Sequence, residues 1–279
     1  MKFTAWEARK HIESKYKTAL RKLGRFLLGL ISDDDSYEDI QKKLSDVQSS
    51  NPFNQWAQSL SHTFVTNTLE ENARTWRQAA QMSGQGETIR RSLETELQGP
   101  VGARVNELIE QNAQYIKSVP EDVRADLTKH VETQAYRGSR TAYKTEDFKK
   151  LVGEMSNNHA KLISRTETSK AMSALTQARA EYTGHDWYIW HTAEDVRVRD
   201  SHKKMDKVLC RFSDPPAPEE LVGEKSNGHY SPGNIFNCRC YAAPVILWRN
   251  VEWPHKVYAN GIISSMGKKQ FMDTFGIEV

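Results

Sequence analysis

Three side chains near the C-terminal end of the chain are of the types that bind a transition metal. Cys238 and Cys240 stand two residues apart, and His202 lies upstream of them. Structural zinc sites take four nitrogen or sulfur ligands, and Cys210 or His229 is available as the fourth. A single Cys-x-Cys is a weak chelate signature, and cysteines are often buried simply as small apolar side chains. The residues leave two interpretations open, a structural zinc site and a metal-free core.

A dense polar string precedes the histidine, with charged groups at Asp195, Arg197, Arg199 and Asp200. A carboxylate beside His202 suits a general base. It also suits an ion-pair network within a fold, because planar Arg side chains bind carboxylates well. We favour the structural role. The sequence has no glycine-rich phosphate loop, no Gly-x-Ser-x-Gly and no His-Glu-x-x-His, so it indicates a protein that is not an enzyme.

Two short strands joined by a long loop are expected to hold these residues. Residues 185–191 are rich in Trp, Tyr and Ile, and residues 241–248 form a second apolar run that suits a partner strand. The chain between them is rich in Pro and Gly, at 214–218 and 223–233. So much irregular chain needs a metal or a neighbouring subunit to hold it. From residue 251 we expect a loop and one helix near 268–275.

The first two thirds of the chain are expected to be helical. We predict helices at 4–30, 37–47, 51–82, 87–97 and 101–117. Three more are expected: one from a capping box at 118–121 to about 137–138, a short one that begins at 145, and one at 156–182 that Gly184 terminates. The fold class is α+β, a mainly helical N-terminal region followed by a small α+β C-terminal module with short antiparallel strands. We divide the chain into a partner-contacting helical region at 1–155, the module at 156–250 and a C-terminal tail at 251–279.

The net charge of +3 is spread unevenly, because the first 30 residues hold eight Lys or Arg and only two Glu. Lys10, Lys17, Arg21 and Lys22 are candidates for contact with DNA or another anionic partner, while a solvated helix or one docked on another subunit remain alternatives. Three cysteines do not form a disulfide framework and indicate a reducing compartment. We expect no secretory signal and no membrane contact, since no segment approaches the roughly 20 apolar residues of a membrane span.

A series of short motifs occurs in a specific order between about residues 162 and 245. The motifs are Arg165-Thr166-Glu167-Thr168, Ala178-Arg179, Gly184, Trp187 or Trp190, Thr192-x-x-Asp195-x-Arg197-Val198-Arg199-x-x-His202, Pro232-Gly233 and Asn237-Cys238-Arg239-Cys240. In order and spacing they resemble the phage head morphogenesis family, the Mu F-like minor head proteins. One departure is Lys207, at a position a few residues after the motif histidine where members often carry glycine.

The resemblance implies a minor head (capsid) protein of a tailed bacteriophage, bound at the portal vertex inside the head and acting in head morphogenesis, DNA packaging or DNA ejection. The implied partners are the portal protein, with the major capsid or scaffold protein and phage DNA as further ones. The implied location is the virion, with assembly in the host cytoplasm. The motif residues are expected to stabilise the module without turnover, and they are Thr192, Asp195, Arg197, Arg199, Asn237, His202, Cys238 and Cys240.

Two alternatives to this function stay open. One is a metal-dependent hydrolase, nuclease or transferase that uses His202. The other is a DNA-binding accessory protein that uses the basic first helix.

Overall fold

The computed structural model describes residues 6–84, 86–136 and 144–279, and the chain forms two compact units. The helical unit comprises Lys10–Thr66 and Glu107–Glu167. The sheet unit comprises the chain up to Arg9, Asn67–Asn106 and Thr168–Val279. Long helices run from one unit into the other, so the compact units do not follow the division after residues 155 and 250.

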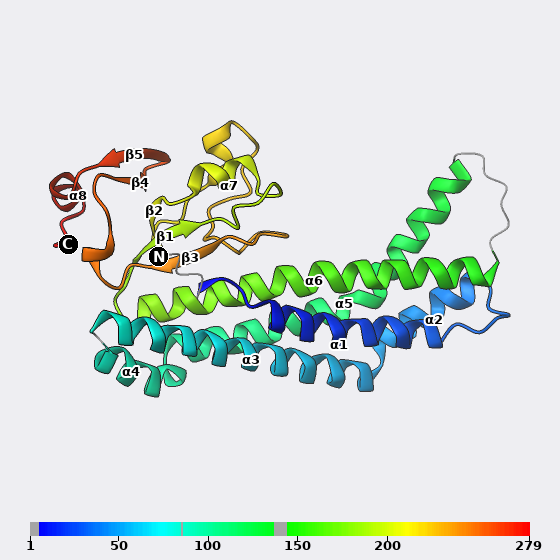
Figure 1. Ribbon diagram of the computed structural model, residues 1–279. Helices are drawn as coiled ribbons and strands as arrows, with labels where there is room; N and C mark the ends of the chain where they lie inside the picture. Colours follow the sequence, from blue (N-terminus) through cyan, green and yellow to red (C-terminus); the bar gives the residue numbers. More distant parts are fainter. Residues whose placement is uncertain (1–5, 85, 137–143) are drawn as a thin grey trace. The chain divides into compact units, whose positions relative to one another are not determined.

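In the residues that the structure describes, the helical unit is built from two complete helices and parts of three others. It contains α1 (Lys10–Gly29), α2 (Tyr37–Ser49), the start of α3 (Asn51–Ser83), the later part of α5 (Pro100–Tyr136) and the first part of α6 (Thr145–Tyr182) (Figure 1). Ser36 caps α2 in a reciprocal capping box with Asp39. The apolar faces meet in one core cluster that includes Leu23, Leu27, Ile40, Leu44, Val123 and Leu127.

Two helices in the structure are longer than the sequence predicts. The predicted capping box at Ser118 is wrong, because α5 continues through Pro120 and bends along its length (Figure 1). Ser118 Oγ instead donates to the Tyr115 carbonyl, 3.0 Å away, and to the Asp122 carboxylate. Likewise, α6 is one helix and not two. The predicted helix end at 137–138 lies outside the described residues.

The first helix turns its apolar face into the helical unit. The Tyr16 ring stacks on Phe64 with centroids 4.1 Å apart, and its hydroxyl donates to Asn112 Oδ1 at 2.7 Å. Gly24 faces Ser156 so closely that a Cβ on the glycine would lie 2.9 Å from the serine Cβ. These contacts leave the basic side chains of α1 on its outer side.

The sheet unit contains the ends of α3 and α6, α4 (Gly86–Thr95), η2 (Glu96–Gln98), the start of α5 and the C-terminal elements. The latter are β1 (Trp187–His191), α7 (Asp200–Met205), β2 (Leu209–Arg211), η3 (Pro218–Val222), β3 (Tyr241–Pro244), η4 (Trp248–Asn250), β4 (His255–Ala259), β5 (Ile262–Met266) and α8 (Lys268–Phe275). The five strands form one sheet in the order β3-β1-β2-β4-β5.

The strand pairing confirms one prediction and corrects another. The predicted partner strands pair antiparallel as β1 and β3, with His191 opposite Tyr241, and β1 and β2 are antiparallel as well, as expected for the module. The parallel pair, β2 with β4, involves a strand of the tail. The tail beyond residue 251 was expected to be a loop before its helix, but it supplies β4 and β5, which extend the sheet. The helix predicted at 268–275 is α8.

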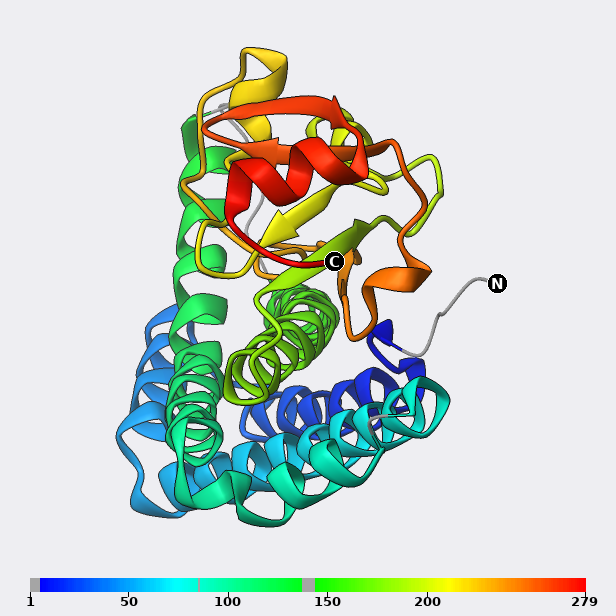
Figure 2. The same cartoon turned by 90° about the vertical axis from the view of Figure 1, so that its left-hand side faces the viewer.

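Alternate residues of the strands pack on opposite faces of the sheet, as the two-residue period of a strand requires. One face carries Trp187, Leu209 and Val257 and packs against Phe271 of α8 (Figure 2). The other face carries Tyr188, Trp190 and Cys210, and its core cluster includes Trp76 of α3 and Ala180 of α6. Within the described ranges, none of the helices has the length and apolar character that a membrane crossing needs.

Candidate functional site: a buried histidine and cysteine cluster

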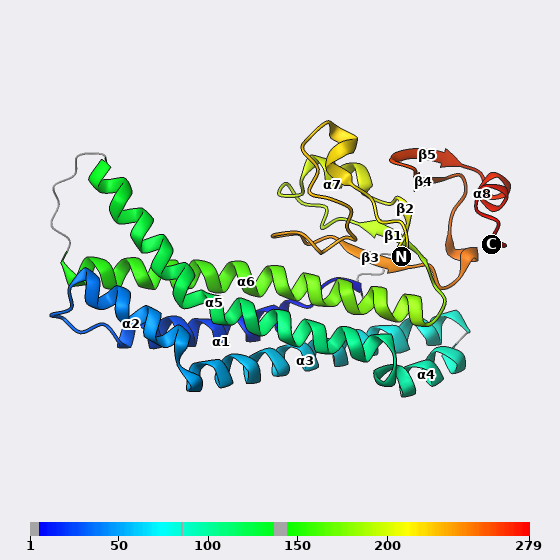
Figure 3. The ribbon, with the colours of Figure 1, turned by 180° about the vertical axis from the view of Figure 1, so that it is seen from behind.

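The two predicted cysteine ligands and the histidine lie together in the sheet unit. His202 is on the short helix α7, while Cys238 and Cys240 are in the loop that leads into β3 and passes close to α7 (Figure 3). Their three candidate ligand atoms lie within 4.8 Å of one another, and all three residues are buried. His202 Nδ1 is 3.6 Å from Cys238 Sγ and 3.4 Å from Cys240 Sγ. Both thiols therefore face the same ring nitrogen.

The other nitrogen of the imidazole belongs to a hydrogen-bond chain. His202 Nε2 is 2.9 Å from the Tyr230 hydroxyl, which in turn donates to Glu219 Oε1 at 2.6 Å. Burial and the Glu219 carboxylate raise the pKa of Tyr230 well above its ordinary value. Burial also raises the pKa of Glu219, but the hydrogen bond from Tyr230 contributes to a net lowering of that pKa. Tyr230 and Glu219 therefore form an ordered donor and acceptor pair behind the histidine.

The two clustered thiols differ in acidity because each acts on the other. The hydrogen bond from Cys240 lowers the pKa of Cys238 despite its burial, and the neighbouring His202 lowers it further. The same hydrogen bond raises the pKa of Cys240, and burial adds to that rise. Of the two sulfurs, Cys238 is therefore the one that ionises first.

The two other candidate ligands lie apart from this cluster. Cys210 is on β2 and its thiol contacts the Val208 carbonyl at 3.6 Å. Burial raises the pKa of Cys210, as expected of a thiol that packs as an apolar side chain. His229 is exposed and its Nδ1 lies 2.8 Å from the Pro215 carbonyl. Neither side chain belongs to the cluster of three in the part of the chain that the structure describes.

The charged motif residues form ion pairs and backbone contacts. The Arg239 guanidinium binds both carboxylate oxygens of Asp195, with Nη2 2.7 Å from Oδ1. This bidentate pair lowers the pKa of Asp195 well below its usual range, helped by the Arg197 backbone N–H. Arg199 donates to the Phe236 carbonyl at 2.7 Å. The polar string thus ties the segment after β1 to the cysteine loop.

Two residues of the motif region, Lys207 and Asn237, adopt a left-handed backbone conformation. Thr192 holds Asp206, since both its backbone N–H and its hydroxyl lie 2.9 Å from Asp206 Oδ1. The next residue, Lys207, has a φ of 60° and donates its N–H to the Trp190 carbonyl. The turn thus needs the left-handed conformation that glycine adopts most readily, and this chain makes it with lysine. Asn237, with a φ of 54°, makes a second left-handed turn just before the cysteines.

The close approach of the Pro232-Gly233 turn explains a further motif. Gly233 has a φ of 93°, and a Cβ there would lie 3.1 Å from the Ser169 carbonyl oxygen and 3.3 Å from that of Cys240. The turn is therefore pressed between α6 and the cysteine loop. On α6 the contacts with this turn come from Ser169 and Ser173.

A buried ion pair at the end of α6 has a larger structural role than the sequence revealed. Arg179 is fully buried, and its Nε and Nη2 each lie 2.6 Å from an oxygen of Glu96 in η2. Its third nitrogen binds Asn72 Oδ1 on α3, and Asn72 also donates to Thr176. The motif pattern included Arg179 but gave no sign of its acidic partner, because 83 residues separate the two.

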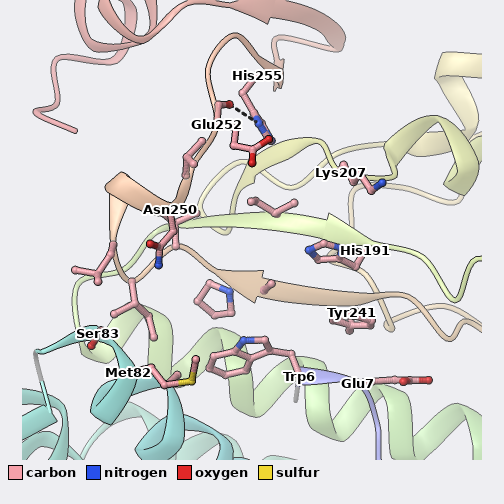
Figure 4. A pocket seen from close by; sticks show the side chains of 18 of the residues that line it. Trp6, Glu7, Met82, Ser83, His191, Lys207, Tyr241, Asn250, Glu252 and His255 are labelled. Atoms are coloured by element: carbon pink, nitrogen blue, oxygen red, sulfur yellow. Dashed lines mark hydrogen bonds between the residues drawn. The ribbon is translucent and has the colours of Figure 1, made fainter. Parts of the chain in front are cut away.

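A groove of about 930 Å³ opens elsewhere in the sheet unit. Trp6, His191, Tyr241 and His255 are among its lining residues, and His202 is not (Figure 4). The His191 ring stacks on Tyr241 with centroids 5.2 Å apart. Burial lowers the pKa of His191 and raises the pKa of Tyr241 to about 12. The groove therefore offers a neutral imidazole and a protonated phenol at neutral pH.

The basic candidates of the first helix lie on its outer face. Lys10, Arg21 and Lys22 are exposed and Lys17 is partly so. Arg21 Nε donates to Asn157 Oδ1 at 2.9 Å, which orients that side chain without neutralising it. The four cations are thus available to an anionic partner.

Comparison with known proteins gives one family and one relative. Residues 122–243 match the family model described as Phage Mu protein F like protein. A protein of Haemophilus influenzae (strain Rd), described as uncharacterized, is 32% identical to this chain over 169 residues. That similarity covers 61% of this chain and 34% of the relative, so the chain spans about a third of the relative's length. No solved structure matches. The family match includes His202, Cys238 and Cys240, confirms the resemblance over residues 122–243 and supports a phage head morphogenesis protein.

Proposed function

We propose that the chain is a minor head protein of a tailed phage that binds the portal protein at the portal vertex, inside the head. The observation that carries the proposal is the family match over residues 122–243, which covers the end of α5, all of α6 and the module as far as β3. Its virion location and its assembly in the host cytoplasm follow from the same proposal. We propose that it acts in head morphogenesis, DNA packaging or DNA ejection.

The arrangement of the motif residues favours a structural role over turnover. His202 is 2% exposed, and both of its ring nitrogens have neighbours, the two thiols on one side and Tyr230 on the other. Asp195, the nearby acid of the motif, is held by Arg239. A general base must reach a substrate proton. These groups contact one another, so we infer that they stabilise the fold of the module.

The outer face of α1 is our candidate for the surface that meets the partner. It presents Lys10, Lys17, Arg21 and Lys22, and charge of one sign on a surface raises the rate of association with an acidic partner. The major capsid or scaffold protein and phage DNA remain further partners for the same surface.

The test is co-purification of the full chain with its cognate portal protein, with native mass spectrometry to count the copies in the complex. We expect a stable complex with few copies of this chain per portal oligomer. Changing Lys10, Lys17, Arg21 and Lys22 to Glu should weaken it. The matched control changes four exposed lysines of the sheet unit to Glu and should leave it intact, and these are Lys225, Lys256, Lys268 and Lys269.

Two results would contradict this function. Failure of the two proteins to associate would remove the portal as partner. Binding of duplex DNA without portal binding would favour the DNA-binding alternative. In that case the logarithm of affinity should fall with the logarithm of salt concentration by about 0.9 per neutralised phosphate, and the α1 variant should show a smaller slope.

A further inference from the structure

We propose that His202, Cys238 and Cys240 bind one zinc ion, through Nδ1 of the histidine and the two cysteine sulfurs. Zinc binds thiolate at about 2.3 Å and imidazole nitrogen at about 2.0–2.1 Å, so tetrahedral geometry separates a nitrogen from a sulfur by about 3.6 Å. The structure has separations of 3.4 and 3.6 Å. Both nitrogen-to-sulfur separations therefore already match those that the ion requires.

Hydrogen bonding alone accounts poorly for this spacing. A neutral imidazole offers one lone pair, and here two sulfurs face the same nitrogen. One S–H group can donate to that lone pair, and the second thiol is then left with the hydrogen bond between the two cysteines, in which S–H is a weak donor and sulfur a weak acceptor. An ion placed between the three atoms satisfies the nitrogen and both sulfurs at once.

The hydrogen-bond chain behind the histidine is an independent observation that points to the same ligand. The Glu219 carboxylate accepts from Tyr230, so the Tyr230 oxygen is free to accept from His202 Nε2–H. With its proton on Nε2, the ring directs the lone pair of Nδ1 toward the sulfurs. Metal-binding histidines commonly have such a partner on the second nitrogen, which fixes both tautomer and orientation. Glu219 is only 2% exposed, so this is an internal arrangement of the fold.

The surroundings suit a neutral cluster. Two thiolates balance the two positive charges of the ion, and a neutral group costs less to bury than a charged one. The Trp190 ring lies 5.5 Å from that of His202, and Met205 belongs to the same apolar core. Three protein ligands leave one of the four zinc positions for a water molecule. The ion would join α7 to the loop before β3, where the chain has little regular secondary structure.

The experiment begins with the full chain, purified in reducing buffer without chelator. Elemental analysis and native mass spectrometry should find one zinc per chain. Cobalt substitution should give the visible absorption of a tetrahedral site and a thiolate-to-cobalt charge-transfer band. Cys238→Ser and Cys240→Ser should each abolish that band, while Cys210→Ser, which removes a buried thiol outside the cluster, should retain it.

The hydrogen-bond chain has its own test. Tyr230→Phe should lower the zinc affinity by about 10–100-fold, the usual effect of losing a partner of a metal-binding histidine. Tyr241→Phe is the matched control, because Tyr241 stacks on His191 and lies outside the cluster, and its affinity should equal that of the wild type. Equal affinities for both variants would refute the role of Tyr230.

Stability measurements keep the proposal testable if the cysteine variants do not fold. A strong chelator should lower the melting temperature of the wild-type chain, and added zinc should restore it. The proposal is overturned if the reduced chain neither contains zinc nor takes up zinc or cobalt. It is also overturned if the chain purified in reducing buffer carries a Cys238–Cys240 disulfide in place of the ion. None of these results depends on portal binding.

Discussion

Replacing Arg179 by alanine should destabilise the sheet unit more than any surface substitution in it. The guanidinium is fully buried and joins three elements, through Glu96 in η2, Asn72 on α3 and its own helix α6. Without it the Glu96 carboxylate, only 7% exposed, stays in the interior with no cation. The Asn72 oxygen also loses its donor.

The expected size of the effect follows from this burial. Removing one partner of a buried ion pair costs about 3–5 kcal/mol, mainly because the remaining charge is left uncompensated. Exposed pairs contribute much less, about 0–1 kcal/mol. Arg90 gives the matched control, because it pairs with Glu87 and Glu94 in the same unit and its side chain is 56% exposed. Arg90→Ala should therefore change the unfolding free energy by less than about 1 kcal/mol.

Urea unfolding followed by tryptophan fluorescence is a suitable assay. Six of the seven tryptophans lie in the sheet unit, and Trp56 alone lies in the helical unit. The signal therefore reports mainly on the unit that contains Arg179. A double-mutant cycle with Glu96→Ala should show strong coupling, since the second substitution removes the stranded charge and costs far less than it does alone.

Two results would refute this reasoning. One is a loss of less than about 1 kcal/mol for Arg179→Ala, similar to that of Arg90→Ala. The other is additivity of the two substitutions in the cycle. Either would mean that water or a rearranged side chain compensates the Glu96 carboxylate when the arginine is absent.

Two further predictions concern the motif region. Lys207→Gly should raise the unfolding free energy by about 1 kcal/mol, because glycine avoids the cost of a left-handed φ. In the same urea assay, the control Lys203→Gly should lower it by a similar amount, because glycine is unfavourable inside the helix α7. A loss of stability for Lys207→Gly would contradict the turn geometry. Arg239 depresses the pKa of Asp195 in the folded state, so this pair stabilises the fold above the unfolded-state pKa of about 3.9 and loses that contribution as the pH falls below it. The difference in unfolding free energy between the wild type and Asp195→Asn should therefore become smaller below about pH 4. A difference that stays constant from pH 7 to pH 3 would exclude the ion pair as its source.

Much of the local structure followed from the sequence. The helices predicted at 37–47 and 51–82 depend on local signals, and α2 and α3 begin at the predicted residues. The strands predicted at 185–191 and 241–248 came from such signals as well, and they contain β1 and β3. The error at Ser118 has a clear physical reason. A capping box competes with continuation of the helix, and packing of Val119 and Val123 in the core of the helical unit favours continuation.

The tail illustrates a second limit of sequence reasoning. Strands β4 and β5 lack strong local signals, and β5 contains two adjacent serines. Their conformation depends on β2, whose edge pairs with β4. It also depends on α8, which packs against the sheet face that carries Leu209 and Val257. Strand propensity depends strongly on such context.

The sequence by itself determined the residue types and spacing that identify the Mu F-like segment, the α+β class and three candidate metal ligands. These depend on neighbours along the chain or on motifs whose order can be read directly. Only the tertiary structure decided which of the five candidate ligands meet, because 36 residues separate His202 from Cys238 while Cys210, nearer in sequence, is held on β2. It alone also paired Arg179 with Glu96 and put Tyr230 and Glu219 behind His202. Contacts of this kind form between segments that are distant along the chain, and packing brings those segments together.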